Sequence, residues 1–106
     1  MARRVHLEDG MLHVTTGTFW WRKRSRIRLN SEEVEMCLTA TSEAGRLLGI
    51  LIVGRDGTEI QLLKSLGDSE GLMRKALQAC KTNGVRVRSK KVENSEWDGG
   101  PGFIAL

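Results

Sequence analysis

A run of arginines at alternate positions is the feature of this sequence best suited to binding chemistry. Residues 19–29 read Phe-Trp-Trp-Arg-Lys-Arg-Ser-Arg-Ile-Arg-Leu. Successive side chains of a strand point to opposite faces, so one face would carry Trp20 followed by Arg22, Arg24, Arg26 and Arg28. Each arginine presents a planar, permanently charged fork that suits a phosphate or a carboxylate. The pattern predicts a surface that binds an anionic partner.

Trp20 and Lys23 complete this candidate site. Trp20 shares the arginine face and could stack on a base or anchor a protein partner, while Lys23 adds charge within the same strand. Two structural explanations of the charge stay open. Charge keeps an exposed strand soluble and protects it from edge pairing. Alternatively, it pairs with glutamates on neighbouring strands, for which the candidates are Glu32, Glu33, Glu35 and Glu59.

A second, shorter basic row follows later in the chain, at Arg86, Arg88 and Lys90. If the two rows form one surface, nucleic acid becomes a more attractive partner. Against that interpretation, the sequence contains no RNA- or DNA-binding motif and no tyrosine.

The other residues that could do chemistry are two histidines and two cysteines. His6 and His13, with Glu8 nearby, could act as a pH switch, but they lack the third and fourth ligands of a metal site. Cys37 and Cys80 are too few for a disulfide framework and lie among apolar residues, so we expect free thiols. The sequence offers no Ser-His-Asp arrangement and no Gly-rich phosphate loop. We therefore expect a non-enzymatic domain with no metal and no cofactor.

Length and charge are those of a single small, mildly basic domain. The chain has 106 residues, a formal net charge of +4 and a pI of about 9.5. This balance permits an anionic partner without demanding one. The sequence has no apolar run long enough to span a bilayer and no signal-peptide pattern, so we expect a cytoplasmic protein.

Alternating apolar residues and Asp-Gly turns predict mostly strands. The first Asp-Gly, at 9–10, predicts a hairpin in which Leu7 pairs with Leu12 and His6 pairs with His13 on the opposite face. The second, at positions 56–57, predicts another hairpin, and its almost continuously apolar first strand should be covered on both faces. The expected strands are residues 3–7, 11–16, 19–29, 34–41, 46–53, 58–64 and 85–91.

Two stretches need further interpretation. The expected strand 19–29 has eleven residues, which is long for a strand, so we expect a bulge or bend near residues 23–25. Asn30 and Glu33 resemble a capping box, which would start a helix, but alternation over 34–41 favours a turn followed by a strand.

One amphipathic helix is predicted over residues 68–82. Asp68 or Ser69 can cap its first turn, and Asn83-Gly84 is a typical stop. The domain would comprise residues 1–91. Residues 92–106 would form a flexible C-terminal tail, whose apolar residues Trp97 and Phe103 could dock on the domain or on a partner.

This order of elements indicates an α+β fold: a curved antiparallel sheet or partly open barrel of about six to seven strands with one C-terminal amphipathic helix. It resembles small bacterial domains of the pleckstrin-homology-like fold over residues 3–82. The motifs that carry the resemblance are Asp9-Gly10-x-Leu12-x-Val14, Arg24-x-Arg26-Ile27-x-Leu29, Asp56-Gly57-x-Glu59-Ile60-x-Leu62 and Leu66-x-Asp68-Ser69-Glu70-x-Leu72. In lipid-binding members, basic residues around the first strands hold a phosphorylated headgroup, and Lys23, Arg24, Arg26 and Arg28 are similar in type and approximate position.

The sequence therefore predicts a non-enzymatic binding module. Its partner is expected to be another protein, bound through the basic, Trp-containing face of strand 19–29. Nucleic acid or an anionic lipid headgroup is the alternative partner of the same face. A third interpretation is a structural subunit that assembles through its C-terminal tail.

Overall fold

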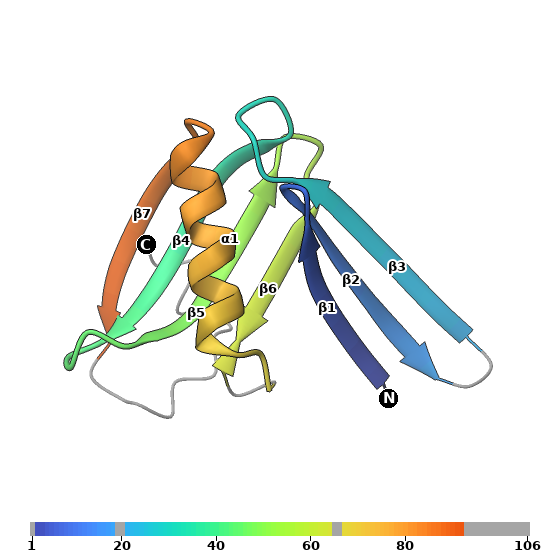
Figure 1. Ribbon diagram of the computed structural model, residues 1–106, viewed down its shortest axis with the longest axis horizontal. Coiled ribbons are helices and arrows are strands. Elements are labelled where there is room, and N and C mark those ends of the chain that lie inside the picture. Colours follow the sequence, from blue (N-terminus) through green and yellow to red (C-terminus); the bar gives the residue numbers. More distant parts are fainter. Residues whose placement is uncertain (1, 19–20, 65–66, 93–106) are drawn as a thin grey trace.

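Seven strands in two sheets and one helix make up the described part of the chain, which is residues 2–18, 21–64 and 67–92 of a computed structural model (Figure 1). The fold is α+β, and the two sheets are not closed into a barrel. The elements are β1 (Ala2–Glu8), β2 (Met11–Thr18), β3 (Trp21–Arg28), β4 (Val34–Ser42), β5 (Leu47–Gly54), β6 (Glu59–Leu63), α1 (Glu70–Thr82) and β7 (Arg86–Val92). Within these residues, no helix has the length and apolar character needed to cross a membrane.

The first sheet has the strand order β1-β2-β3, and its hairpin register is the predicted one. Leu7 lies opposite Leu12 and His6 lies opposite His13. Asp9 and Gly10 both have positive φ, 51° and 75°, as a type I′ turn requires.

The bulge expected near residues 23–25 does not occur. The β2–β3 register runs without interruption from Met11 opposite Arg28 to Thr18 opposite Trp21. The inward residues of the two strands match one another, with Leu12 opposite Ile27, so no extra residue is needed to keep the apolar side chains on one face. Residues 19 and 20, the start of the expected strand, lie outside the described residues.

The second sheet has the strand order β6-β5-β4-β7. The chain from Val34 is a strand, as the alternation predicts, and the apolar β5 lies between β4 and β6. The expectation of one antiparallel sheet is wrong in two respects: the strands form two sheets, and β7 pairs parallel with β4. This direction follows from the connection: α1 carries the chain across the sheet after β6, so β7 runs in the direction of β6. Since β6 and β4 both pair antiparallel with β5, that is also the direction of β4.

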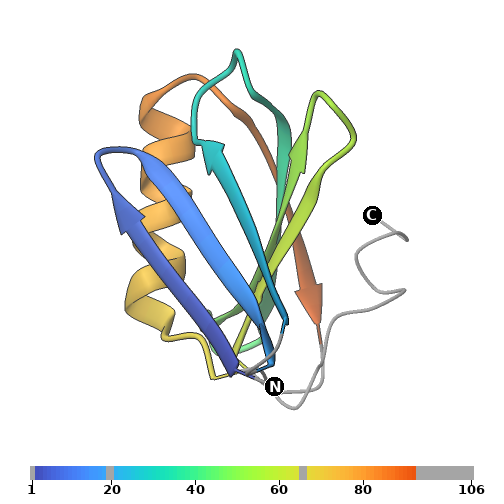
Figure 2. The same cartoon turned by 90° about the vertical axis from the view of Figure 1, so that its right-hand side faces the viewer.

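The first sheet and α1 both pack on the same side of the second sheet (Figure 2). The main core lies between them and that sheet. The helix contributes Met73, Ala76 and Cys80, which belong to the predicted apolar stripe. From the sheets come Leu12, Val14, Ile27, Val34, Cys37, Leu47, Ile50, Ile52, Ile60 and Leu62. Leu29, just after β3, and Val85, just before β7, complete the set. We call this set the inner core.

The helix begins and ends at the predicted positions. Ser69 is the N-cap, and its side chain accepts a hydrogen bond from the Leu72 N–H at 3.1 Å. Asp68 instead points back to β6, where its Oδ2 accepts a hydrogen bond from the Leu63 N–H at 2.8 Å. At the other end Asn83 is the C-cap, and Gly84 follows with a φ of 75°.

The two cysteines are free thiols in the inner core, Cys37 on β4 and Cys80 on α1. A hydrogen bond with Cys80, together with burial, raises the pKa of the Cys37 thiol. Only the thiolate reacts readily, so we expect iodoacetamide to label Cys37 roughly a hundredfold more slowly in the folded protein than in urea. Peptide mapping by mass spectrometry measures each cysteine separately. Fast labelling of Cys37 without unfolding would contradict the expectation.

Candidate functional site

The outward face of the first sheet brings together arginines from β1 and β3, on either side of β2. In the backbone register, Thr15 of β2 lies between Arg4 and Arg24, and His13 of β2 lies between His6 and Arg26. Neighbouring strands lie about 4.8 Å apart, and residues two apart in one strand are separated by about 6.8 Å. We call this surface the basic face, and its described side chains are Arg4, His6, Glu8, Met11, His13, Thr15, Arg24, Arg26 and Arg28.

Three arginines of the basic face are available to a partner. Arg4, Arg24 and Arg26 are exposed, and none makes a hydrogen bond or ion pair with another described side chain. Arg28 differs, because its Nε lies 3.7 Å from Oε2 of Glu33. Of the glutamates considered as partners from sequence, only Glu33 pairs with this row within the described residues. Most arginines of the basic face are therefore not paired with an acidic side chain of the described residues.

The histidines stack on one another in the middle of this face. Their ring centroids are 4.6 Å apart and the ring planes differ by 7°. Nε2 of His6 also lies 3.6 Å from Oε2 of Glu8, and both side chains are more than half exposed. Lone pairs on ring nitrogens lie in the ring plane, so two parallel rings do not converge on one ion. In agreement with this, no group of three or more metal-ligating residues is found in the described part of the chain.

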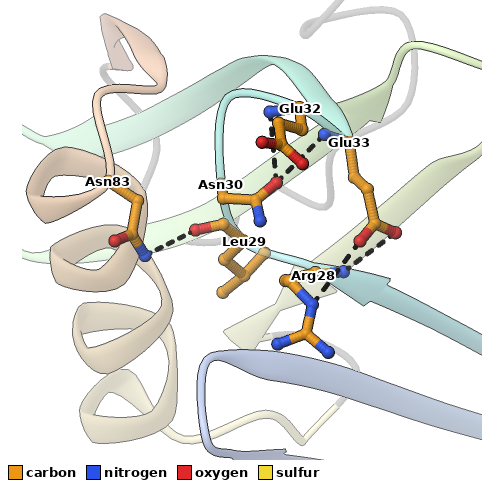
Figure 3. A network of polar contacts seen from close by, with 6 residues as sticks. All are labelled: Arg28, Leu29, Asn30, Glu32, Glu33 and Asn83. Carbon is orange, nitrogen blue, oxygen red and sulfur yellow. Dashed lines mark hydrogen bonds and ion pairs between the residues drawn. The ribbon is translucent and has the colours of Figure 1, made fainter.

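A polar network holds the connection from β3 to β4 against the end of the basic face (Figure 3). The Asn30 side chain accepts hydrogen bonds from the N–H groups of Glu32 and Glu33, both at 3.1 Å, as the N-cap of a helix would, but only one turn follows before β4 begins at Val34. Nδ2 of Asn83, at the end of α1, donates to the Leu29 carbonyl at 2.8 Å. The turn places Glu33 beside Arg28, whose backbone N–H also donates to it at 3.5 Å.

A small depression lies next to this connection, with a volume of about 180 Å³. Its charged lining is mixed, with Arg26 and Arg55 opposed by three acidic residues. Two of its polar groups are already used: Nε of Arg55 donates to the Ser31 carbonyl at 2.8 Å, and Asp56 accepts from the Thr58 N–H at 2.9 Å. That hydrogen bond holds the pKa of the Asp56 carboxyl below its usual value. The lining gives an anion no consistent attraction.

The structure divides the sequence-predicted site residues among different places. Arg24, Arg26 and Arg28 share the basic face, whereas Lys23, at the alternate position, lies on the opposite face of the sheet. The backbone of Arg22 belongs to β3, but its side chain, like the whole of Trp20, lies outside what the structure describes. Trp97 and Phe103 also fall outside the described residues.

The second basic row does not merge with the first. Arg86, Arg88 and Lys90 lie on β7 at the edge of the four-stranded sheet, whereas the basic face belongs to β1–β3 (Figure 1). The sequence alone did not show that Arg4 belongs to the basic face. The hairpin pattern placed Arg4 on the outward face with the histidines, but only the pairing of β2 with β3 connects that face to the arginine row.

The two cysteines do not take part in this surface. Both cysteines are buried in the inner core, away from the histidines on the outward face of the first sheet. What the basic face can do chemically is donate hydrogen bonds and positive charge to an anionic group. No protein-family model, no curated protein and no solved structure matches the chain, so a function has to be argued from this geometry.

Proposed function

We propose that this domain is a non-enzymatic binding module that recognises acidic side chains of a partner protein through its basic face. The observation that carries the proposal is the set of three exposed arginines, Arg4, Arg24 and Arg26, without ion pairs among the described residues. Guanidinium forks bind carboxylates in a bidentate manner, and arginine is enriched at protein interfaces. The excess of positive charge on this face also steers an acidic partner into contact.

Trp20 and Arg22 would extend the same surface. They precede Arg24 at the alternate positions that this face of a strand requires. In the proposal, Arg22 adds a further fork and Trp20 supplies the apolar anchor that charged contacts alone do not provide.

A protein partner fits better than nucleic acid for two reasons. The two basic rows belong to different sheets, so the positive charge does not form one continuous surface for a long polyanion. Among the sequence positions of this face, Trp20 alone is a phenylalanine, tyrosine or tryptophan, and a single ring can stack few of the successive bases of a nucleic acid. Nucleic acid or an anionic lipid headgroup, bound by the same arginines, is the alternative that the experiment below distinguishes.

The pleckstrin-homology-like resemblance belongs to the same proposal. Strands followed by one helix support it, and the parallel strand β7 after the helix is an addition to the simplest version of that fold. A shared fold would not fix the ligand, because one fold hosts many functions.

Charge reversal on the basic face tests the proposal. We expect the double variant Arg24→Glu, Arg26→Glu to bind a fluorescent acidic peptide at least about tenfold more weakly, or about 1.4 kcal/mol, because attraction becomes repulsion. Fluorescence anisotropy at low and at physiological salt measures the change. The matched control, Arg46→Glu with Lys75→Glu, makes the same change of net charge at exposed positions on the β4–β5 loop and on α1, and should leave the affinity within about twofold.

Parallel titrations with a mixed-sequence oligonucleotide and with phosphatidylserine vesicles identify the class of partner. Tighter binding of the oligonucleotide or the vesicles than of the peptide, lost in the Arg24, Arg26 variant, would replace the protein partner by that alternative. If the Arg24, Arg26 variant and the Arg46, Lys75 control lost the same amount of affinity, a role for the basic face would be contradicted, since net charge alone would then explain the binding.

A further inference from the structure

The second sheet has a second apolar face, on the side away from α1. Its residues form a cluster separate from the inner core, and every member belongs to β4–β7: Leu38, Ala40, Leu48, Leu51, Leu63 and Val92, with Met36 and Val53 packed against them. We call this surface the outer face. All core residues of α1 and of the first sheet belong to the inner core instead, and Figure 2 shows those elements on the opposite side of the sheet.

The outer face is buried, although no described helix or strand lies over it. Leu48 is 2% exposed and Leu51 is 5% exposed, and both lie on β5 in the middle of the sheet. A sheet face of leucines needs a covering layer, because apolar surface left in water is unfavourable and promotes association. The cover has to come from outside the described elements.

We propose that the C-terminal segment of this chain, residues 93–106, packs on the outer face. The segment begins in the right place, because Val92 ends β7 and is itself a member of the outer cluster. It is also long enough: fourteen extended residues reach about 46 Å, whereas four strands span about 15–20 Å.

The composition of the segment complements the outer face in two ways. Its apolar residues Trp97, Phe103, Ile104 and Leu106 suit the leucine surface. Its acidic residues Glu93, Glu96 and Asp98 suit the basic row of β7. In the parallel register Arg86 lies beside Met36 and Arg88 beside Leu38, so this row shares the outer face with the apolar cluster. The second basic row is thereby assigned to holding the chain's own segment, and not to the ligand of the basic face.

Nuclear Overhauser spectra of the full-length chain test the proposal directly. With methyl-labelled leucine and isoleucine, we expect cross-peaks from the Trp97 indole or the Phe103 ring to methyl groups of Leu48 or Leu51. The isoleucines of the same strand, Ile50 and Ile52, face the inner core and serve as the matched control, which should show none. A sample that mixes labelled and unlabelled chains should give no intermolecular cross-peaks.

Two outcomes would overturn the proposal. Cross-peaks that appear only between chains would assign the outer face to a second copy. An absence of cross-peaks from both aromatic rings to any outer-face methyl group would leave the face to another occupant.

Substitutions in the segment give an independent measure. We expect Trp97→Ala to lower Tm by about 5–10 °C, because a large apolar contact is lost, whereas Ser95→Ala in the same segment should change Tm by less than about 2 °C. Binding of a hydrophobic dye should rise for Trp97→Ala alone. An unchanged Tm and unchanged dye binding for Trp97→Ala would contradict the proposed cover.

Discussion

Replacing Ile52 by alanine is expected to lower the free energy of unfolding by about 2–5 kcal/mol. Ile52 is 0% exposed and lies on β5, in the part of the inner core that the two sheets and α1 share. The change removes apolar contacts and leaves a cavity that the closely packed side chains of the two sheets and α1 cannot easily close. Because domains of this size have a total stability of about 5–15 kcal/mol, Tm should fall by about 10–30 °C in a thermal melt.

Two controls show whether packing is the cause. Ile52→Val removes one methylene group at the same position and should lower the free energy of unfolding by about 0.5–1.5 kcal/mol. Val53→Ala, at a half-buried position on the other face of the strand, should have a smaller effect than Ile52→Ala. If Ile52→Ala lowered the free energy of unfolding no more than Ile52→Val does, the role of Ile52 in packing the inner core would be contradicted.

The Asp68→Ala variant is expected to lose about 1–3 kcal/mol of stability, a large effect for a polar residue. Oδ2 of Asp68 accepts the Leu63 N–H at 2.8 Å, and both residues are buried, at 9% and 3% exposure. Alanine leaves that N–H without this acceptor next to the core, so the full desolvation penalty of the donor appears. Urea unfolding monitored by circular dichroism measures the loss.

The contribution of the acceptor can be separated from those of the charge and of the helix cap. Asp68→Asn keeps a side-chain oxygen that can accept the same hydrogen bond, so it should retain more stability than Asp68→Ala. Ser69→Ala removes the actual N-cap and should lose about 1 kcal/mol independently. If Asp68→Asn were as unstable as Asp68→Ala, the carboxylate charge would matter and not the acceptor.

The elements that could be predicted from sequence are those fixed by local chemistry. The turn at Asp9 and Gly10 sets the first hairpin, and a one-residue slip would move Leu7 and Leu12 to the wrong face. The helix follows equally directly from its apolar stripe and its stop at Asn83. After Asn30 the hydrogen bonds of a capping residue do form, but the chain makes a single turn and the alternation from Val34 gives a strand.

The parts that sequence could not predict depend on how the strands are ordered in space. Alternation correctly placed Arg24 and Arg26 on one face, but it could not reveal that Arg4 joins them across β2. The sequence offered Glu33 as one of four candidate partners of the arginines, but it could not single out the pair with Arg28, because that pair depends on the path of the connecting turn. The parallel direction of β7 and the separation of the two basic rows are likewise consequences of the helical crossover.

The parallel pairing of β4 with β7 also sets the order in which the domain can be completed during synthesis. The paired residues Thr39 and Ser89 are 50 positions apart, so one edge of β4 stays without its strand until almost all of the described chain has been made. An unpaired apolar edge is a template for aggregation, and contacts between such distant residues form slowly. This edge of β4 should therefore be the last part of the second sheet to be protected as the chain is made.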